Sequence, residues 1–220
     1  MDNLAKKTRL YSVIFLALYL IFFFFLDKSI SLWVNDHLTS TWIFDAGTYL
    51  SYIADGSFIR ITVALCFIVI LVFDPTIKHQ WTRMLLYVAL SAAIALVVGE
   101  GLKIFLGRHR PIMLYEQEQY GLHFFTEQWE MNSTPSGHSL RIFSILTALS
   151  LLFKKWSAVF ITIAVWVCLS RVIVTAHYPS DVLFGAYIGI FAALWTYKNY
   201  RPLERKVSIT TRSSKTENSA

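Results

Sequence analysis

Charged residues are scarce in this chain. Only 15% of its 220 residues are Asp, Glu, Lys or Arg, whereas an average globular protein has about 25%. Hydrophobic residues make up 55% of the sequence, and the mean hydropathy is +0.51. The shortage of charge, together with several long apolar runs, argues against a water-soluble enzyme and indicates an integral membrane protein.

Cysteine is also rare, and the few charges are unevenly placed. The two cysteines, Cys66 and Cys168, both lie inside apolar runs, so we expect buried thiols rather than a disulfide bond. The net charge of +6 comes mostly from short loops and tails between the apolar runs. This placement argues against nucleic acid as a partner. No internal repeat and no second domain are found.

Six apolar runs approach the length of about 20 residues that crosses a bilayer. The first follows a basic segment and lacks a small-residue cleavage site, so we expect an uncleaved span rather than a signal peptide. The mixed stretch at 28–56 is expected to include a helix that lies in the membrane interface. The six expected spans are 10–26, 57–73, 84–106, 139–153, 156–176 and 182–197.

These runs predict an all-α fold, a polytopic bundle of six transmembrane helices in one domain at 1–202. A polar tail at 203–220 is expected to be disordered and cytoplasmic. With six spans, the side that holds both termini carries 13 of the 20 Lys and Arg residues. The positive-inside rule therefore places both termini in the cytoplasm and the opposite end of the bundle outside.

Three polar clusters fall on that outer side, and the first reads KIFLGRHRP. Lys103 lies in the last turns of the third span, and Arg110 follows beyond Gly107, a plausible C-terminal helix cap. The two cations could bind an anion together. Alternatively, Lys103 pairs with Glu100 one turn earlier while the arginine contacts lipid headgroups.

The second cluster reads NSTPSGHS and resembles the start of a helix. We expect Thr134 at the N-cap and Pro135 at the first helical position. Gly137 leaves room for a ligand to approach the backbone. The unpaired N–H groups of Ser136, Gly137 and His138 would then point outward, as in other anion sites at helix N-termini. A plain helix cap would need no histidine.

The third cluster reads SRVIVTAHYPSD and lies between the last two spans. Because Tyr178 precedes Pro179, the chain leaves the helical region there, and the proline suits the first turn of the next helix. His177 then lies on the turn, with Asp181 four residues away and within reach. An imidazole steered by a carboxylate, with Arg171 nearby, suits attack on a phosphate or acyl group. Interfacial charges that cap two helices are the alternative.

Together the clusters resemble the three-part signature of the type 2 phosphatidic acid phosphatase family. These are membrane-bound lipid phosphatases, related to bacterial class A acid phosphatases and vanadium haloperoxidases. The signature is Lys-x6-Arg-Pro, then Pro-Ser-Gly-His, then Ser-Arg-x5-His-x3-Asp. This chain matches every part with its spacing between residues 103 and 181, through Lys103, Arg110, Pro111, Pro135, Ser136, Gly137, His138, Ser170, Arg171, His177 and Asp181.

The resemblance implies a mechanism. His177 would attack the phosphorus to form a phosphohistidine, with Asp181 holding the imidazole in its productive tautomer. His138 would protonate the leaving group, and water would hydrolyse the intermediate. No cofactor or metal is implied, and the motifs contain no carboxylate cluster that would hold Mg²⁺. The phosphate oxygens would be held by Lys103, Arg110, Arg171 and the amides of Ser136 and Gly137.

Other polar residues have more ordinary interpretations. Arg108 and His109 are expected to be solvated at the interface. Arg141, one turn beyond the histidine of the second cluster, would contact the substrate headgroup or extend its charge to the surface. The loop at 112–132 is expected to be solvated and to cover the site as a lid.

The sequence therefore predicts a membrane lipid phosphatase at the outer face of a bacterial inner membrane. No motif selects the phosphorylated lipid, and undecaprenyl diphosphate is favoured among the candidates. One alternative is a lipid phosphotransferase that passes the phosphoryl group to a second lipid such as lipid A. Another is a non-enzymatic anion transporter, which would need a polar track towards the cytoplasm. The last three spans offer few such groups, chiefly Ser144, Thr147, Ser150 and Thr162.

Overall fold

The computed structural model describes residues 2–200 and, for side chains, residues 8–200. All regular elements in this range are helical, with one isolated β-bridge between Arg108 and Leu122. The predicted all-α class is confirmed, while the predicted tail lies outside the described residues. The α-helices are α1 (Asp2–Ile21), α2 (Asp27–Leu38), α3 (Trp42–Ser51), α4 (Gly56–Phe73), α5 (Gln80–Leu106), α6 (Pro111–Gln117), α7 (Gly137–Leu152), α8 (Ser157–Ile173) and α9 (Pro179–Asn199).

Five helical runs among the described residues are long and apolar enough to cross a membrane. They are Thr8–Leu38, Trp42–Phe73, Gln80–Leu106, Lys154–Ile173 and Pro179–Asn199. The expected fourth span corresponds to α7, which is apolar but has only 16 residues. This is shorter than the roughly 20 residues that a spanning helix needs. The structure thus has five helical runs of spanning length and one shorter apolar helix.

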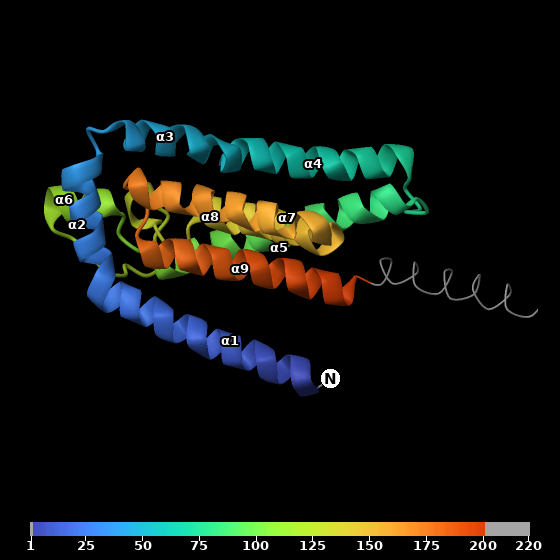
Figure 1. Ribbon diagram of the computed structural model, residues 1–220, viewed down its shortest axis with the longest axis horizontal. Helices are drawn as coiled ribbons and strands as arrows, with labels where there is room; N and C mark the ends of the chain where they lie inside the picture. The colour runs from blue at the N-terminus through green and yellow to red at the C-terminus, as the bar shows by residue number, and fades with distance from the viewer. Residues whose placement is uncertain (1, 201–220) are drawn as a thin grey trace, which may run out of the picture.

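The stretch expected to hold an interfacial helix divides into two different parts. A π-helical turn, η1 (Phe22–Leu26), joins α1 to α2. In Figure 1, α2 lies across one end of the bundle, whereas α3 continues in the direction of α4 along its length. The orientation expected for an interfacial helix therefore fits α2 and not α3.

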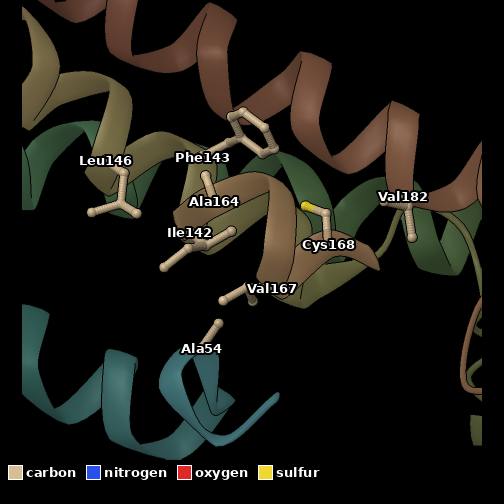
Figure 2. Close-up of a cluster of buried hydrophobic side chains, with 8 residues drawn as sticks. All are labelled: Ala54, Ile142, Phe143, Leu146, Ala164, Val167, Cys168 and Val182. Carbon is tan, nitrogen blue, oxygen red and sulfur yellow. The ribbon is translucent and has the colours of Figure 1, made fainter. Parts of the chain in front are cut away.

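Helix α7 is the centre of the bundle and packs between α5, α8 and α9. It buries 11 of its 16 residues. Figure 2 shows the largest apolar cluster, to which α7 contributes Ile142, Phe143 and Leu146. On the other side, Gly189 of α9 brings the two backbones together, because a Cβ there would lie 2.6 Å from the carbonyl oxygen of Leu140. Because α7 is enclosed by other helices and not by lipid, it can carry polar side chains that face the interior of the bundle.

The two cysteines are free in the structure, as the sequence predicts. Cys168 is buried in the cluster of Figure 2, and Cys66 is partly buried on α4.

The three polar clusters lie at one end of the bundle. The α4–α5 connection, the start of α1 and the end of α9 all lie at one end in Figure 1. The opposite end carries α2, α6, the loop before α7 and the α8–α9 turn. The sequence expectation that the three clusters share an end is confirmed.

Close packing of α7 on α9 predicts that Gly189→Ala lowers the stability of the protein. The added methyl group must displace the α7 backbone, an overpacking cost of about 1–3 kcal/mol. Gly101→Ala is the matched control, because a Cβ at Gly101 meets no atom within 4 Å. Thermal unfolding in detergent should show a lower melting temperature for the first variant alone. Equal melting temperatures would contradict the close approach.

Candidate active site

The first cluster begins where α5 ends. Gly107 takes the left-handed conformation, with φ 53° and ψ 50°, and its N–H donates to the carbonyl of Lys103 at 2.9 Å. The predicted C-cap is confirmed. A Cβ at this position would collide with the backbone of His123, so glycine is required for both its conformation and its lack of a side chain. The cap turns the chain so that the following loop folds back over the helix end.

The second cluster starts α7 later than the sequence predicts. The helix begins at Gly137 with Ser136 as its N-cap, so the predicted roles of Thr134 and Pro135 are wrong. The N–H of Ser136 donates to the carbonyl of Asp181 at 3.0 Å. The prediction that this N–H group points outward is therefore wrong. In the first turn of α7, the N–H groups of Gly137 and His138 have no intrahelical acceptor and remain available for an anion.

The third cluster forms the expected turn. Tyr178 is extended, with φ −74° and ψ 156°, Pro179 opens α9, and Asp181 lies in its first turn. The Asp181 Oδ2 lies 3.9 Å from Nδ1 of His177, which is too far for a direct hydrogen bond. Ser133 fills this gap, because its hydroxyl donates to Asp181 Oδ2 at 2.5 Å and lies 3.5 Å from His177 Nδ1.

Sequence reasoning missed Ser133. It belongs to the second cluster but lies outside the family signature. Its proximity to Asp181 depends on a contact between segments 48 residues apart.

His177 is buried among cations and is only 4% exposed. Burial, followed by the charges of Arg110, Arg171 and Lys103, lowers the pKa of His177 well below its usual value. The imidazole is therefore neutral at neutral pH. A neutral imidazole has the free lone pair that a nucleophile needs.

Arg110 connects the loop before α7 to the turn that carries His177. Its Nε donates to the carbonyl of Trp129 at 2.8 Å, and its guanidinium lies over the Trp129 ring at 4.2 Å. The two Nη atoms donate to the carbonyls of Ala176 and Asn132, each at 3.3 Å. Burial lowers the pKa of Arg110 to about 10, so the group is still charged at neutral pH.

Lys103 and Arg141 converge on the backbone at the start of α7. A Cβ at Gly137 would lie 3.1 Å from Lys103 Nζ and 2.9 Å from an Nη of Arg141. The sequence alternative, a pair between Lys103 and Glu100, is also present, at 3.7 Å. Two cations and two free backbone N–H groups therefore meet at one point. A side chain at Gly137 would push Arg141 away from this point.

Arg141 also fixes the ring of His138. It is 4% exposed, so it does not extend its charge to the surface. Its Nε and one Nη donate to the carbonyl of Ala54 at 3.1 and 3.0 Å, and the same Nη lies 3.2 Å from His138 Nδ1. A guanidinium is only a donor, so Nδ1 accepts. In the neutral ring, the proton of His138 is then on Nε2.

Arg171 closes the turn that carries His177. Its carbonyl accepts hydrogen bonds from the N–H groups of Ala176 and His177 at 3.1 and 3.2 Å. Its side chain lies in the last turn of α8, and the buried Nε has no hydrogen-bond partner within the described part of the chain.

Arg108 is buried, contrary to the expectation that it is solvated. Its guanidinium is fully inaccessible and donates to Asp181 Oδ1 at 2.5 Å and Asp27 Oδ2 at 2.8 Å. Burial alone would lower the pKa of Arg108, but Asp181, Tyr120 and Asp27 hold it above its usual value. His109 beside it is only partly buried, and its N–H donates to the carbonyl of Gly121 at 3.1 Å.

The loop expected to be a solvated lid is fastened to the end of α5. The N–H of His123 donates to the carbonyl of Gly107 at 2.7 Å, and that of Thr126 to Ile104 at 3.1 Å. Within residues 8–200, no three His, Cys, Asp or Glu side chains gather as a metal-binding group.

Comparison with known proteins identifies the family. The model of the PAP2 superfamily matches residues 84–205, which include all three clusters. The chain belongs to the PAP2 superfamily. The chain has several helices of spanning length, and its bacterial relatives include a transmembrane PAP2-type phosphatase, so this PAP2 protein is a multi-pass bacterial membrane protein.

The curated relatives align with part of this PAP2 chain. A lipid A 1-phosphatase of Rhizobium johnstonii is 33% identical over 110 residues, covering 50% of this chain and 45% of that protein. One from Rhizobium etli is 37% identical over 95 residues, covering 43% and 41%. The bacitracin transport permease protein BcrC of Bacillus licheniformis is 27% identical over 114 residues, covering 52% and 54%. The chain thus matches about half the length of these relatives.

Two solved structures have a similar fold. Aquifex aeolicus LpxE superposes with a TM-score of 0.60 at 23% identity, covering 81% of this chain and 98% of that one. A PAP2-type phosphatidylglycerolphosphate phosphatase of Bacillus subtilis gives 0.54 at 19% identity, covering 89% and 94%. At these identities the likeness concerns the fold.

The surroundings of His177 predict that its imidazole stays neutral in mildly acidic solution. A pKa lowered by burial and nearby cations shifts protonation below the usual range, which is centred near pH 6.5. NMR of ring-labelled histidine, with the His177 signal assigned from His177→Asn, should show no titration between about pH 6 and 8. The urea-unfolded chain serves as the control. A native transition near 6.5 would contradict the structure.

Proposed function

We propose that this PAP2 protein is a membrane lipid phosphatase that works through a phosphohistidine at His177. The observation that carries the proposal is a buried, neutral imidazole that faces cations and lies beside the carboxylate of Asp181. A nucleophile, fixed cations and a helix N-terminus are the parts that phosphoryl transfer needs. Family membership and the names of the curated relatives support this function.

The geometry supports Nε2 of His177 as the attacking atom. His177 Nδ1 faces Asp181 and Ser133, which leaves Nε2 free to attack the phosphorus. As the P–N bond forms, the P–O bond to the lipid breaks and the imidazole becomes positively charged. The carboxylate, with the serine hydroxyl between, holds the Nδ1 proton and stabilises that charge.

His138 is the proton donor in this proposal. Arg141 contacts its Nδ1, so Nε2 faces the leaving oxygen. The donor is the imidazolium, formed when the negative charge of the substrate phosphate enters the site, and loss of its Nε2 proton to the leaving oxygen returns the ring to neutral. In the second step the same nitrogen takes a proton from water as the water attacks the phosphohistidine. Phosphate is released and both histidines return to their initial state. No step needs a metal or cofactor.

The phosphate oxygens are bound by groups from all three clusters. Lys103, Arg110 and Arg171 supply charge, and the N–H of Gly137 is available at the start of α7. The N–H of Ser136 is already bonded to Asp181, but its hydroxyl is buried without a partner among the described residues. We assign that hydroxyl, in place of the amide, to the phosphate.

The proposed substrate is a lipid phosphate or diphosphate. Sequence reasoning favours undecaprenyl diphosphate. Two relatives named lipid A 1-phosphatase make a lipid A phosphate a second candidate. A phosphotransferase would use the same residues and differ only in requiring an acceptor lipid.

We infer six spans in one domain at 1–202, with α7 as the short fourth span. Both termini are then cytoplasmic and the site lies at the outer face. The arrangement in Figure 1 and the basic residues near the termini support this orientation.

A lipid panel tests the function. Purified protein with EDTA should release phosphate from at least one of undecaprenyl diphosphate, phosphatidylglycerol phosphate, phosphatidic acid and lipid A. His177→Ala should lower turnover at least about a thousandfold, because the nucleophile is lost. His37→Ala, at an exposed histidine of α2, should leave it unchanged. Undiminished turnover in His177→Ala would refute the assigned role. Release that appears only with an acceptor lipid would identify a transferase.

A further inference from the structure

Asp27 is a buried carboxylate at the start of α2, far in sequence from the three clusters. It lies outside the residues that match the PAP2 family, 84–205, yet it is 0% exposed. Its Oδ1 accepts the N–H of Ser180 at 3.0 Å. Its Oδ2 accepts the Ser180 hydroxyl and Nη2 of Arg108, the latter at 2.8 Å. A buried carboxylate is costly unless it is paired in this way.

Arg108 joins Asp27 to the carboxylate of the proposed active site. Its Nη1 donates to Asp181 Oδ1 at 2.5 Å and to the Ser180 hydroxyl at 2.6 Å. The rings of Phe23 and Tyr178 lie over its guanidinium, with centroids at 4.5 and 4.4 Å. Because a guanidinium is planar and rigid, fixing one of its nitrogens also fixes the other.

The junction of η1 and α2 contributes two of these contacts from one turn. Phe23 lies in the π-helical segment and Asp27 directly follows it. Phe23 and Asp27 are four residues apart, and both side chains contact the guanidinium of Arg108. Single π-helical turns are often found at functional sites. This turn places a ring and a carboxylate on the same guanidinium.

The contacts of Asp181 explain why the position of Arg108 matters for the proposed attack by His177. Oδ1 of Asp181 accepts from Arg108, while Oδ2 of Asp181 accepts from Ser133 and from the N–H of Tyr178. Oδ2 is the oxygen nearest His177. A shift of the guanidinium would therefore rotate the carboxylate away from the imidazole.

Charge gives Asp27 a second effect. Asp27 and Asp181 share a single guanidinium, so the buried group carries one net negative charge beside His177. In the proposed mechanism His177 becomes positively charged when the P–N bond forms. A nearby negative charge stabilises that state more than the neutral ground state.

We propose that Asp27 is a positioning residue of the active site, which acts through Arg108 to hold Asp181 towards His177 and to balance the charge of the phosphohistidine. The proposal rests on the lipid phosphatase function proposed above.

Asp27→Asn tests the proposal, with Asp36→Asn as the matched control. Both substitutions remove one carboxylate charge from α2, but Asp36 is exposed. In full-length protein, with a lipid that the wild type hydrolyses, kcat should fall about tenfold in Asp27→Asn. KM should stay within about threefold because the protein cations that bind the substrate phosphate are unchanged. The control should keep wild-type values. An unchanged kcat in folded Asp27→Asn overturns the proposal.

The pH profile separates positioning from a purely structural role. Removing a negative charge disfavours protonation of His177, so its pKa falls and the acidic limb of kcat/KM moves to lower pH. A loss of folded protein alone would lower the amount of active enzyme without moving this limb. The charged and titratable groups that face His177 are Lys103 on α5, Arg110 in the following loop, His138 on α7, Arg171 on α8 and Asp181 on α9.

Ser180→Ala is the second variant if Asp27→Asn does not fold. It keeps every charge but removes the hydroxyl shared by Asp27 and Arg108. It should lower kcat several-fold with KM unchanged, and a wild-type kcat would overturn the proposal. Wild-type protein that releases no phosphate from any lipid refutes the phosphatase function itself. An active wild type with unaffected variants refutes only the role of Asp27.

Discussion

The buried guanidinium of Arg108 is the interaction on which the polar end of this protein depends. It joins the start of α2, the loop after α5 and the start of α9 through two carboxylates, Asp27 and Asp181. All three charges are fully inaccessible. Removing one partner of a buried ion pair leaves an uncompensated charge, at a cost of about 3–5 kcal/mol. The same contacts that hold the helices together therefore set the orientation of the carboxylate nearest His177.

The site combines a neutral His177 with an excess of cations. Lys103 and Arg141 converge on the start of α7, and Arg110 is held by carbonyls of the His177 turn and of the loop before α7. Burial, together with the charges of Arg110, Arg171 and Lys103, lowers the pKa of His177 and so keeps it unprotonated. In the proposed reaction, the charge that favours an unprotonated nucleophile is also the charge that binds the phosphate.

Local features of the sequence predicted much of this end correctly. The Gly107 cap, the extended residue before Pro179 and the position of Asp181 in the first turn of α9 all follow from short-range rules, and all are confirmed. The start of α7 was predicted too early, at Pro135 with Thr134 as the N-cap, because Ser136 provides a later N-cap.

Long-range pairing explains the remaining errors. Asp27 follows an apolar run and precedes a lysine, so it resembles an ordinary interfacial residue. Its partner Arg108 is 81 residues away. Ser133 likewise meets Asp181 only through tertiary packing. The burial of a charge depends on its distant partners, which a single sequence does not reveal.

Direct detection of the phosphorylated residue is the sharpest test of the mechanism proposed for this PAP2 protein. The enzyme would be mixed with a ³²P-labelled lipid substrate, quenched in alkali during turnover and mapped by mass spectrometry. Phosphate on His177, absent in His177→Ala, is the expected result. Steady turnover with label on another residue, or with no labelled protein at any time point, would contradict a phosphohistidine at this position.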